Sequence, residues 1–329
     1  MSTEILTPRL VLTAVLTIGL LALPFLGATL NASAIVGLGT QILIYAIAAM
    51  SLNLILGYGG LVSFGHAAFF GIGGYVVGIL YQHFAEGSSF LGLLPGSSAF
   101  LVVVPLAMLV SGAAAAIIGA FSLRTGGVQF IMITLAFAQM LFYVFVSLKT
   151  YGGDDGLMMR RRDALPFVDT RDDTTFYFLC LVLAALWFAL TAVLVRSPFG
   201  FVLAGLRQNE RRMAAMGVAP YPYKLAAFVI AGMGAGLAGA LMANYLRFAS
   251  PDMMHWAKSG ELMMIVILGG VGTLTGPLLG AAALVLLETS LTAATENWQL
   301  PLGVTLLAVV LFTQGGLSAI LRRVLGERA

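Results

Sequence analysis

Long stretches without a charged side chain dominate this sequence. Between Arg9 and Arg124 the only charged residue is Glu86. Further charge-free runs occupy residues 174–195, 225–246, 262–287 and 297–321. Each run approaches or exceeds the roughly 20 apolar residues that a helix needs to cross a bilayer. The chain is therefore predicted to be an all-α, polytopic membrane protein, because the strands of a membrane β-barrel would alternate in polarity over about ten residues.

Composition narrows the range of functions. Of the 329 residues, 60% are hydrophobic and 9% are charged, whereas soluble domains carry about 25% charged residues. The single cysteine, Cys180, leaves no intrachain disulfide or thiolate metal site, and the three histidines lie far apart in the sequence. The sequence contains no P-loop and no nucleophile–base pattern. We predict a protein that is not an enzyme, needs no cofactor and binds no nucleic acid.

Apolar runs predict about eight to ten spans, some broken by glycine, in one transmembrane domain, 1–329. The expected helices cover 9–29, 34–56, 62–83, 98–121, 128–149, 175–195, 224–247, an interrupted 261–290, and 299–320. The two arms of the interrupted segment either re-enter from one side or cross as a pair. The first helix is expected to be retained, because its apolar run is long for a signal peptide and many spans follow it.

Basic residues indicate the orientation. They gather in alternate loops, which the positive-inside rule assigns to the cytoplasm. The loop 196–223 is the largest of these, whereas the loop 150–174 mixes basic and acidic residues and is assigned to the outside. The run Arg160-Arg161-Arg162 opposes this assignment, but neighbouring aspartates offset it.

The cytoplasmic loop is predicted to form one amphipathic helix that begins at Pro198 and ends at Gly217. Proline suits the first turn of a helix, and glycine suits its end. At 100° per residue, one face carries Val202, Leu206, Asn209, Met213, Met216 and Gly217, and the other carries Arg207, Gln208, Arg211 and Arg212. Such a helix either binds a soluble partner or lies on anionic lipid headgroups.

Three segments are rich in glycine: 57–75, 223–241 and 267–281. The second contains a ridge of small residues, Gly232, Gly236 and Ala240, which predicts close helix packing. The other two combine glycine with hydroxyl or imidazole groups, so their backbone is expected to break. Broken helices at membrane depth lie buried in protein or line a cavity, and they mark transport pathways. The candidate pathway residues are Asn53, Ser63, His66, Thr273 and Thr275.

Ionisable residues near membrane depth leave alternatives open. His66 either hydrogen-bonds a passing solute or ties two helices together. Glu261 and Glu288 are functional candidates because carboxylates inside a membrane are costly. Each could instead lie at a helix end, where Glu261 would be favoured by the helix dipole.

Five blocks, which together extend over most of the chain, point to a family. They are 51–54 with 57–67 (GYGGLVSFGHA), 134–137 (TLAF), 152–157 (GGDDGL), 197–217, and 268–277. Jointly they resemble the permease subunits of branched-chain amino acid ABC importers, specifically the M-type (LivM) family. The resemblance implies translocation of branched-chain amino acids, or of urea, amides or aromatic acids, across the bacterial inner membrane.

The resemblance also implies partners. These are a second (H-type) permease, two cytoplasmic ATP-binding subunits and a periplasmic substrate-binding protein, all around a chain embedded in the lipid bilayer. The loop 196–223 would couple to the ATP-binding subunits through Gly200, Arg207, Asn209, Glu210, Arg211, Ala215 and Gly217. The family's E-A-A-x-x-x-G pattern is absent there, since residues 213–217 read MAAMG, and Glu210 is the substitute acid.

The outer loop 150–174 is predicted to dock the substrate-binding protein. The candidate residues are Asp154, Asp155, Arg160, Arg161 and Arg162. Alternatively, the arginines pair with Asp154, Asp155 or Asp163 and only hold the shape of the loop. The competing function is a stand-alone secondary transporter or channel for a small polar solute, which would require a charge or ion site on its path.

Overall fold

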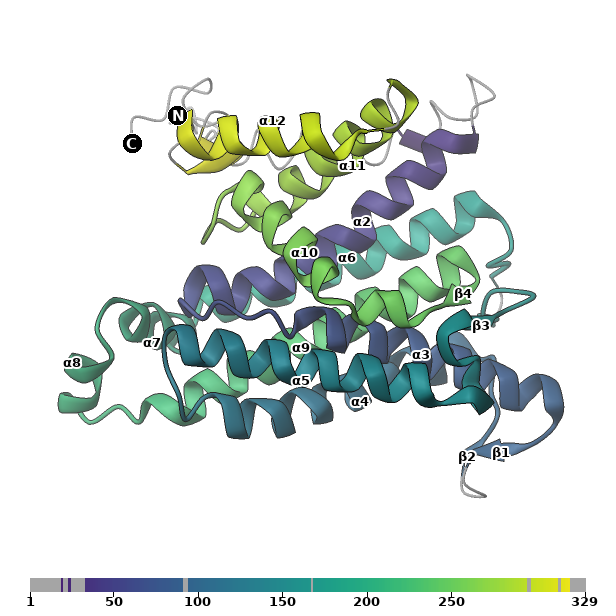
Figure 1. The fold of residues 1–329 in the computed structure, drawn as a ribbon, viewed down its shortest axis with the longest axis horizontal. Coiled ribbons are helices and arrows are strands. Elements are labelled where there is room, and N and C mark those ends of the chain that lie inside the picture. Colours follow the sequence, from purple (N-terminus) through teal and green to yellow (C-terminus); the bar gives the residue numbers. More distant parts are fainter. Residues whose placement is uncertain are drawn as a thin grey trace, which may run out of the picture.

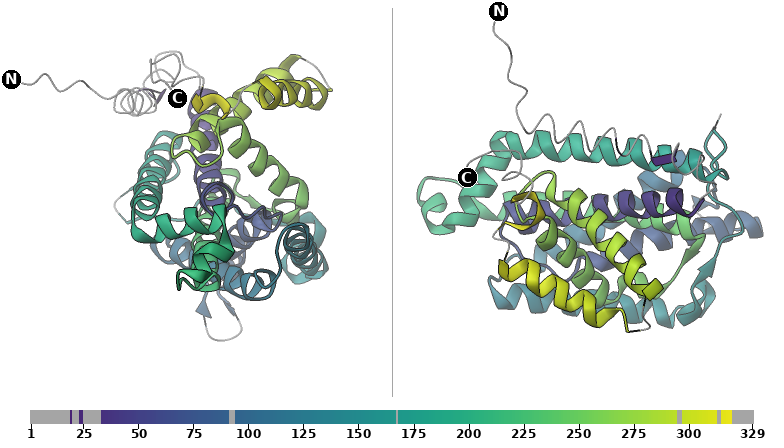
Figure 2. Two further views of the ribbon diagram at one scale, coloured as in Figure 1. Left: turned by 90° about the vertical axis from the view of Figure 1, so that its left-hand side faces the viewer. Right: turned by 90° about the horizontal axis from the view of Figure 1, so that it is seen from above.

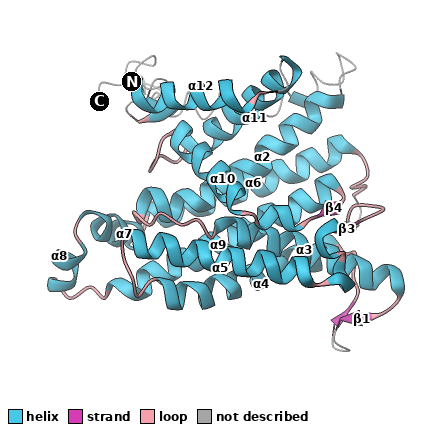
Figure 3. Cartoon of the chain, viewed as in Figure 1, coloured by secondary structure: helices cyan, strands magenta, loops and turns pink. Residues whose placement is uncertain are grey.

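The protein is almost entirely helical (Figure 3). The computed structural model describes residues 33–90, 94–166, 168–294, 297–312 and 315–319, together with Gly19 and residues 23–24. Seven helices within these ranges are long and apolar enough to cross a membrane, so the predicted all-α, polytopic fold is confirmed. The predicted first span, 9–29, lies almost wholly outside the described residues, and the total of eight to ten spans stays a prediction.

Ten longer helices form the bundle in the described ranges. They are α2 (Ser33–Asn53), α3 (His66–Glu86), α4 (Phe100–Ser122), α5 (Val128–Ser147), α6 (Asp173–Arg196), α7 (Pro198–Gln208), α9 (Pro220–Leu246), α10 (Trp256–Gly269), α11 (Gly276–Ala294) and α12 (Gln299–Phe312). Helix α2 continues into a π-helix, η1 (Leu54–Tyr58), and α8 (Glu210–Ala215) is a short helix after α7.

The loops contain the remaining elements of the described chain. Three 3-10 turns are η2 (Lys149–Tyr151), η3 (Gly153–Asp155) and η4 (Pro251–Met254). Two antiparallel strand pairs join β1 (Ser89–Phe90) to β2 (Leu94–Pro95), and β3 (Leu157–Met158) to β4 (Phe248–Ala249). In the second pair Leu157 lies opposite Ala249, which fastens the loop 150–174 to the segment after α9.

Most helices run along the longest axis of the molecule, so the loops gather at its two ends (Figure 1). Helices α7 and α8 mark one end, the α7–α8 end, and strands β1–β4 mark the other, the hairpin end. The loops 196–223 and 150–174 therefore lie at opposite ends, in agreement with their predicted assignment to opposite sides of the membrane. An end-on view shows α11 and α12 at the edge of the bundle (Figure 2).

Helix α9 is the centre of the packing and contacts α2, α3 and α4. A Cβ atom at Gly239 would lie 1.7 Å from the carbonyl oxygen of Phe70, and one at Gly236 would lie 2.3 Å from Ser111 Oγ. In a membrane, helices associate through such close contacts of small residues. The predicted packing role of the segment 223–241 is confirmed, and its helix is unbroken.

The outward faces of α4, α5 and α6 are apolar. Leu101, Met132 and Leu186 are large side chains among those exposed on these faces. Exposed apolar surface of this extent marks a contact with membrane or protein. Together with the seven candidate spans, it indicates a multi-pass membrane protein.

The two glycine-rich segments that were predicted to break do so. After η1 the backbone stays non-helical until α3 begins at His66, later than the predicted start at 62. The interrupted segment divides into α10 and α11 around residues 270–275, where Gly270 and Gly272 have φ angles of 119° and 77°. Glycine adopts such angles without the steric cost that other residues meet.

Candidate functional site

The two broken segments meet at the side chain of Asn53. Its Oδ1 accepts a hydrogen bond from the backbone nitrogen of Gly272 at 2.9 Å, and its Nδ2 donates to the carbonyl oxygen of Thr273 at 2.9 Å. Buried backbone groups need such partners when they are not in a helix. We name residues 53–60 and 270–275 the glycine junction, because one buried amide holds both segments together.

At Gly57 the two segments of the glycine junction approach each other closely. A Cβ atom there would lie 2.2 Å from Asn53 Oδ1 and 2.6 Å from the backbone nitrogen of Gly272. Interiors are packed too densely to accept an added atom at these distances without movement. Any side chain at this position would therefore push the two segments apart.

Arg207 connects helix α7 to the glycine junction. Its Nη1 donates a hydrogen bond to the carbonyl oxygen of Gly57. A Cβ atom at Gly60, where φ is +68°, would lie 2.8 Å from Arg207 Cγ. The arginine stem thus lies against one broken segment. Arg207 is exposed as a residue, so solvent screens this charged hydrogen bond, and we expect a contribution near the lower end of the usual range of about 1.5–3 kcal/mol.

The prediction of a single helix from Pro198 to Gly217 is wrong, because α7 and α8 are separate helices. Asn209 has an extended backbone (φ −159°, ψ 98°), and its side chain accepts a hydrogen bond from the backbone nitrogen of Arg212 at 2.9 Å. Asparagine is a favoured N-cap, so it ends one helix and starts the next. The predicted ends hold: Pro198 begins α7, and Gly217, with φ +88°, follows α8.

The other predicted coupling residues are partly anchored and partly exposed. Glu210 forms an ion pair with Lys224 at 2.6 Å, which ties α8 to the N-terminal part of α9. Gly200 is buried, and a Cβ atom there would lie 2.2 Å from the carbonyl oxygen of Val195. The exposed members are Asn209, Glu210, Arg211, Ala215 and Gly217.

A cavity of about 680 Å³ opens at the α7–α8 end. Its walls include Gly59 and Gly60 of the glycine junction, the next two residues, the loop between α4 and α5, and Arg207, Glu210 and Lys224. The cavity therefore borders both the coupling helices and a broken segment.

Two of the predicted pathway hydroxyl groups are used inside the protein. Ser63 Oγ accepts a hydrogen bond from the backbone nitrogen two residues later at 3.2 Å. Thr273 Oγ1 donates to the carbonyl oxygen of Gly270 at 2.8 Å and accepts from the backbone nitrogen of Gly276 at 3.1 Å. Thr275 lies just before α11 and is half-buried. These contacts stabilise the non-helical backbone.

His66 begins α3 and is fully buried. Its Nε2 lies 3.2 Å from Ser51 Oγ on α2, and its ring packs edge-on against Phe69. This arrangement supports the alternative in which His66 ties two helices together. Contact of His66 with a solute stays a prediction.

Arg162 is buried in the outer loop rather than presented for docking. Its Nη2 pairs with Asp173 Oδ1 at 2.6 Å, its Nη1 donates to the carbonyl oxygen of Thr170 at 3.2 Å, and its guanidinium lies 4.5 Å from the ring centre of Phe176. Arg162 thus holds the shape of the loop, as the alternative interpretation stated. Its partner is Asp173, which starts α6, and not one of the three aspartates considered from the sequence.

The remaining candidates for docking lie on the surface at the hairpin end. Asp154, Asp155 and Arg160 are exposed, and the guanidinium of Arg161 lies 5.3 Å from the ring centre of Phe84. A cation over a ring at the surface contributes only about 0.5–1 kcal/mol, so Arg161 is held less firmly than Arg162.

Asp163 and Asn244 form a buried polar pair that the sequence analysis missed. Asn244 Nδ2 donates to Asp163 Oδ2 at 3.1 Å, and the backbone nitrogen of Asp163 donates to Asn244 Oδ1 at 2.8 Å. Burial raises the pKa of Asp163 to about 6, although the hydrogen bond from Asn244 opposes the shift. The only signal in the sequence is an asparagine within an otherwise apolar run.

A second cavity, of about 880 Å³, contains a cluster of charged and polar side chains, of which only Glu261 and Glu288 were candidates from the sequence. It brings Glu261 and Glu288 together with Lys258 and Tyr45. The missed signal is the spacing of Lys258 and Glu261, which are three residues apart and so share one face of a helix.

These features define a multi-pass membrane permease, with helices packed around α9, two glycine-broken segments joined by Asn53, and a surface helix that contacts one of them. The chain belongs to the family described as "Branched-chain amino acid transport system / permease component", whose sequence model matches residues 34–313. The resemblance inferred from the sequence blocks is confirmed.

Curated relatives agree with this assignment. The chain is 28% identical to the "High-affinity branched-chain amino acid transport system permease protein LivM" of Salmonella typhimurium, and the match covers 87% of this chain and 70% of the relative. The protein of the same name from Escherichia coli is 27% identical with the same coverage. A "Probable branched-chain amino acid transport permease protein LivM" from Methanocaldococcus jannaschii is 25% identical over 79% of this chain and 82% of the relative. No solved structure matches significantly.

Proposed function

We propose that the chain is a transmembrane permease subunit of an ABC importer in a bacterial inner membrane. The substrate is a branched-chain amino acid or a related small polar solute. Family membership and the names of the curated relatives support this proposal. The single observation that carries it is the hydrogen bond from Arg207 on α7 to Gly57, because it connects a surface helix to the end of a candidate membrane span, next to a broken segment.

In this proposal two separate ATP-binding subunits dock at the α7–α8 end. The exposed side chains of Asn209, Arg211 and Ala215 support a contact there. Glu210 is paired with Lys224. In this proposal it positions α8 and does not itself contact an ATP-binding subunit. A second, H-type permease completes the transmembrane unit.

The physical mechanism is a two-state movement. Closure of the ATP-binding subunits would displace α7, and Arg207 would pass this displacement to Gly57. Asn53 would pass it on to Gly272 and Thr273 through its two hydrogen bonds. Interfaces of this kind switch between discrete packings rather than deform continuously.

The pathway is proposed to run beside the glycine junction. The candidate residues are Asn53, Thr273 and Thr275 in the junction, and Ser63 and His66 after its first segment. Their polar atoms would face a solute only when the segments separate. The non-helical backbone supports the proposal, because such backbone at membrane depth lies buried in protein or lines a cavity.

At the hairpin end a periplasmic substrate-binding protein is proposed to dock on Asp154, Asp155, Arg160 and Arg161. Their exposure and mixed charge support a rim contact, and such charge pairs govern association rates more than affinity. Arg162 supports this surface from beneath.

Reconstitution in liposomes tests the proposal. The chain is combined with its second permease, the ATP-binding subunits and a binding protein loaded with radiolabelled L-leucine. We expect accumulation that requires ATP hydrolysis. Accumulation driven by an ion gradient in the absence of ATP would instead support a stand-alone secondary transporter, for which the charged cluster around Lys258 is the relevant observation.

A further inference from the structure

The cavity of about 880 Å³ lies near the hairpin end, between α2, the end of α9, the η4–α10 segment, α11 and α12. Small-molecule sites commonly have volumes of about 300–1,000 Å³, with mostly apolar walls and a few polar groups. The cavity has this composition, since its apolar wall includes Met242, Leu246, Met264, Leu284, Leu302 and Leu306. It thus offers room for a small solute with an aliphatic part.

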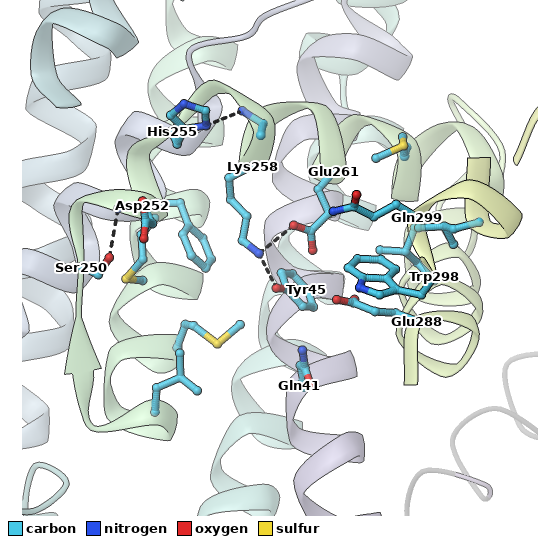
Figure 4. Close-up of a pocket in the computed structure, with 18 of the residues that line it drawn as sticks. Gln41, Tyr45, Ser250, Asp252, His255, Lys258, Glu261, Glu288, Trp298 and Gln299 are labelled. Carbon is cyan, nitrogen blue, oxygen red and sulfur yellow. Dashed lines mark hydrogen bonds and ion pairs between the residues drawn. The ribbon is translucent and has the colours of Figure 1, made fainter. Parts of the chain in front are cut away.

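The polar wall of the cavity centres on Lys258 (Figure 4). Its Nζ donates a hydrogen bond to the Tyr45 hydroxyl at 2.5 Å and to Glu261 Oε2 at 2.7 Å. The side chains of Lys258 and Glu261 are each 22% exposed, so a solute in the cavity can reach both charges. Lys258 and Glu261 both lie on α10, Tyr45 lies on α2, and these two helices pack against each other.

Glu288 is the unexplained group in this cavity. Its carboxylate points into the cavity toward Tyr45 (Figure 4), and it forms no ion pair with any residue that the structure describes. Among the described residues that line the cavity, Asp252, Glu261 and Glu288 outnumber the single cation Lys258. A half-buried carboxylate without a partner is costly, and an ammonium group would remove that cost.

We propose that this cavity binds a free aliphatic α-amino acid. Glu288 receives the α-ammonium group, Lys258 receives the α-carboxylate, and the apolar wall covers the side chain. The inference rests on the proposed function and adds to it a substrate site distinct from the glycine junction.

The location suits a site that is loaded before the glycine junction opens. The cavity lies toward the hairpin end, where the substrate-binding protein is proposed to dock. Helix α2 carries both Tyr45 and, two turns later, Asn53 of the junction. Helix α10 carries Lys258 and ends where residues 270–275 begin. Both elements therefore run from the proposed site to the junction.

A zwitterionic lipid headgroup has the same chemistry as the proposed ligand. Phosphatidylethanolamine combines a primary ammonium, an anion and acyl chains, and it would also suit an acidic cavity with apolar walls. The proposal commits to the free amino acid, and the lipid is an outcome that the experiment separates.

The test measures direct binding of radiolabelled L-leucine to the purified full chain in nanodiscs of phosphatidylcholine, without a binding protein or ATP. Two analogues probe the charges: 3-methylbutylamine lacks the carboxylate, and 4-methylpentanoate lacks the ammonium. Glu288→Gln should weaken leucine binding at least tenfold and leave competition by 4-methylpentanoate unchanged. Glu86→Gln, the same change at an exposed glutamate outside the cavity, should bind leucine as the unmodified chain does.

Three results would overturn the site. They are no leucine binding to the unmodified chain, equal leucine binding by Glu288→Gln, or leucine binding that vanishes when phosphatidylethanolamine replaces phosphatidylcholine. None of these results tests the proposed function, because that function is tested by measuring ATP-dependent uptake in the assembled importer. Normal uptake together with an unaffected Glu288→Gln variant would reject this cavity alone, whereas absence of any ATP-dependent uptake would reject the importer.

Discussion

The guanidinium of Arg207 hydrogen-bonds the carbonyl oxygen of Gly57, 150 residues earlier in the sequence. The contact joins a short helix at the surface to the first broken segment, and Asn53 joins that segment to the second. A displacement of α7 would therefore reach both segments through three side-chain hydrogen bonds. This short chain of contacts can be cut at single residues.

Replacing Arg207 should uncouple transport from ATP hydrolysis. Arg207→Ala removes the hydrogen bond to Gly57, and we expect uptake in the reconstituted importer to fall at least tenfold, because a loss of about 1.5 kcal/mol, the lower end of the range for a charged hydrogen bond, corresponds to roughly that factor. Co-purification of the ATP-binding subunits should be unchanged. Arg211→Ala is the matched control: it lies exposed on α8, so we expect weaker co-purification with little internal effect. Loss of ATP-binding subunits in both variants alike would show that Arg207 acts only as a docking residue.

Gly57→Ala should damage the glycine junction itself. The added methyl group would lie 2.2 Å from Asn53 Oδ1, and overpacking of this kind typically costs about 1–3 kcal/mol. We expect a lower midpoint of thermal unfolding in detergent and loss of uptake. Gly126→Ala, where an added Cβ meets no atom within 4 Å, should leave both measurements unchanged. A Gly57→Ala chain with normal stability and uptake would contradict the close approach of the two segments.

Cysteine labelling tests whether the glycine junction opens. Cys180 is fully buried and is first replaced by serine. Thr273→Cys should then react with small polar thiol reagents when the importer turns over, and more slowly without ATP, because the threonine hydroxyl is bonded within the loop at rest. Ser63→Cys should behave in the same way. Equal and complete protection of both cysteines with and without ATP would identify the junction as static packing.

Much of the fold could be predicted, because the length of an apolar run and its glycine content determine locally whether a helix forms and where it breaks. The run 225–246 is charge-free, and it forms the unbroken α9. The breaks at 59–65 and 270–275 could also be predicted, because glycine clusters beside hydroxyl residues do not continue a helix. Periodicity failed at Asn209, where a side chain caps the next helix. Helical projection assumes one continuous helix and contains no information about a cap in its middle.

The long-range contacts of the site could not be predicted. Nothing in the sequence near Arg207 indicates that its partner is a carbonyl oxygen at Gly57, and nothing near Asn53 indicates Gly272. Similarly, Arg162 was expected to pair with Asp154, Asp155 or Asp163 but pairs with Asp173 at the start of α6. Local patterns fix which residues are polar at a given depth, whereas tertiary packing selects their partners.

Replacing Arg162 should affect the stability of the protein, whereas replacing Arg160 should affect docking of the substrate-binding protein. Arg162→Ala removes the ion pair to Asp173 and the hydrogen bond to the Thr170 carbonyl oxygen. Since Asp173 is 62% exposed, solvent screens part of the effect, and we expect a destabilisation of about 1–2 kcal/mol, read as a lower thermal midpoint. Arg160→Ala should keep the midpoint and raise the concentration of loaded binding protein needed for half-maximal uptake, most clearly at low salt. Identical behaviour of the two variants would contradict this division.

Asp163 should give the protein a measurable pH dependence of stability. Its pKa is raised from 3.8 to about 6 by burial, so the folded state binds the proton more tightly than the unfolded state does. The stability contributed by protonation is therefore fully present below about pH 4 and is lost as the pH rises through about 6. Asp163→Asn keeps an acceptor for Asn244 without the charge. We expect it to unfold at a higher temperature than the unmodified chain at pH 7.5, with the difference shrinking toward pH 4.5. Asp169→Asn, at an exposed aspartate, controls for loss of a surface charge. If the unfolding temperatures of the unmodified chain and Asp163→Asn changed in parallel with pH across this range, the Asp163 carboxylate would be as well solvated in the folded protein as in the unfolded chain.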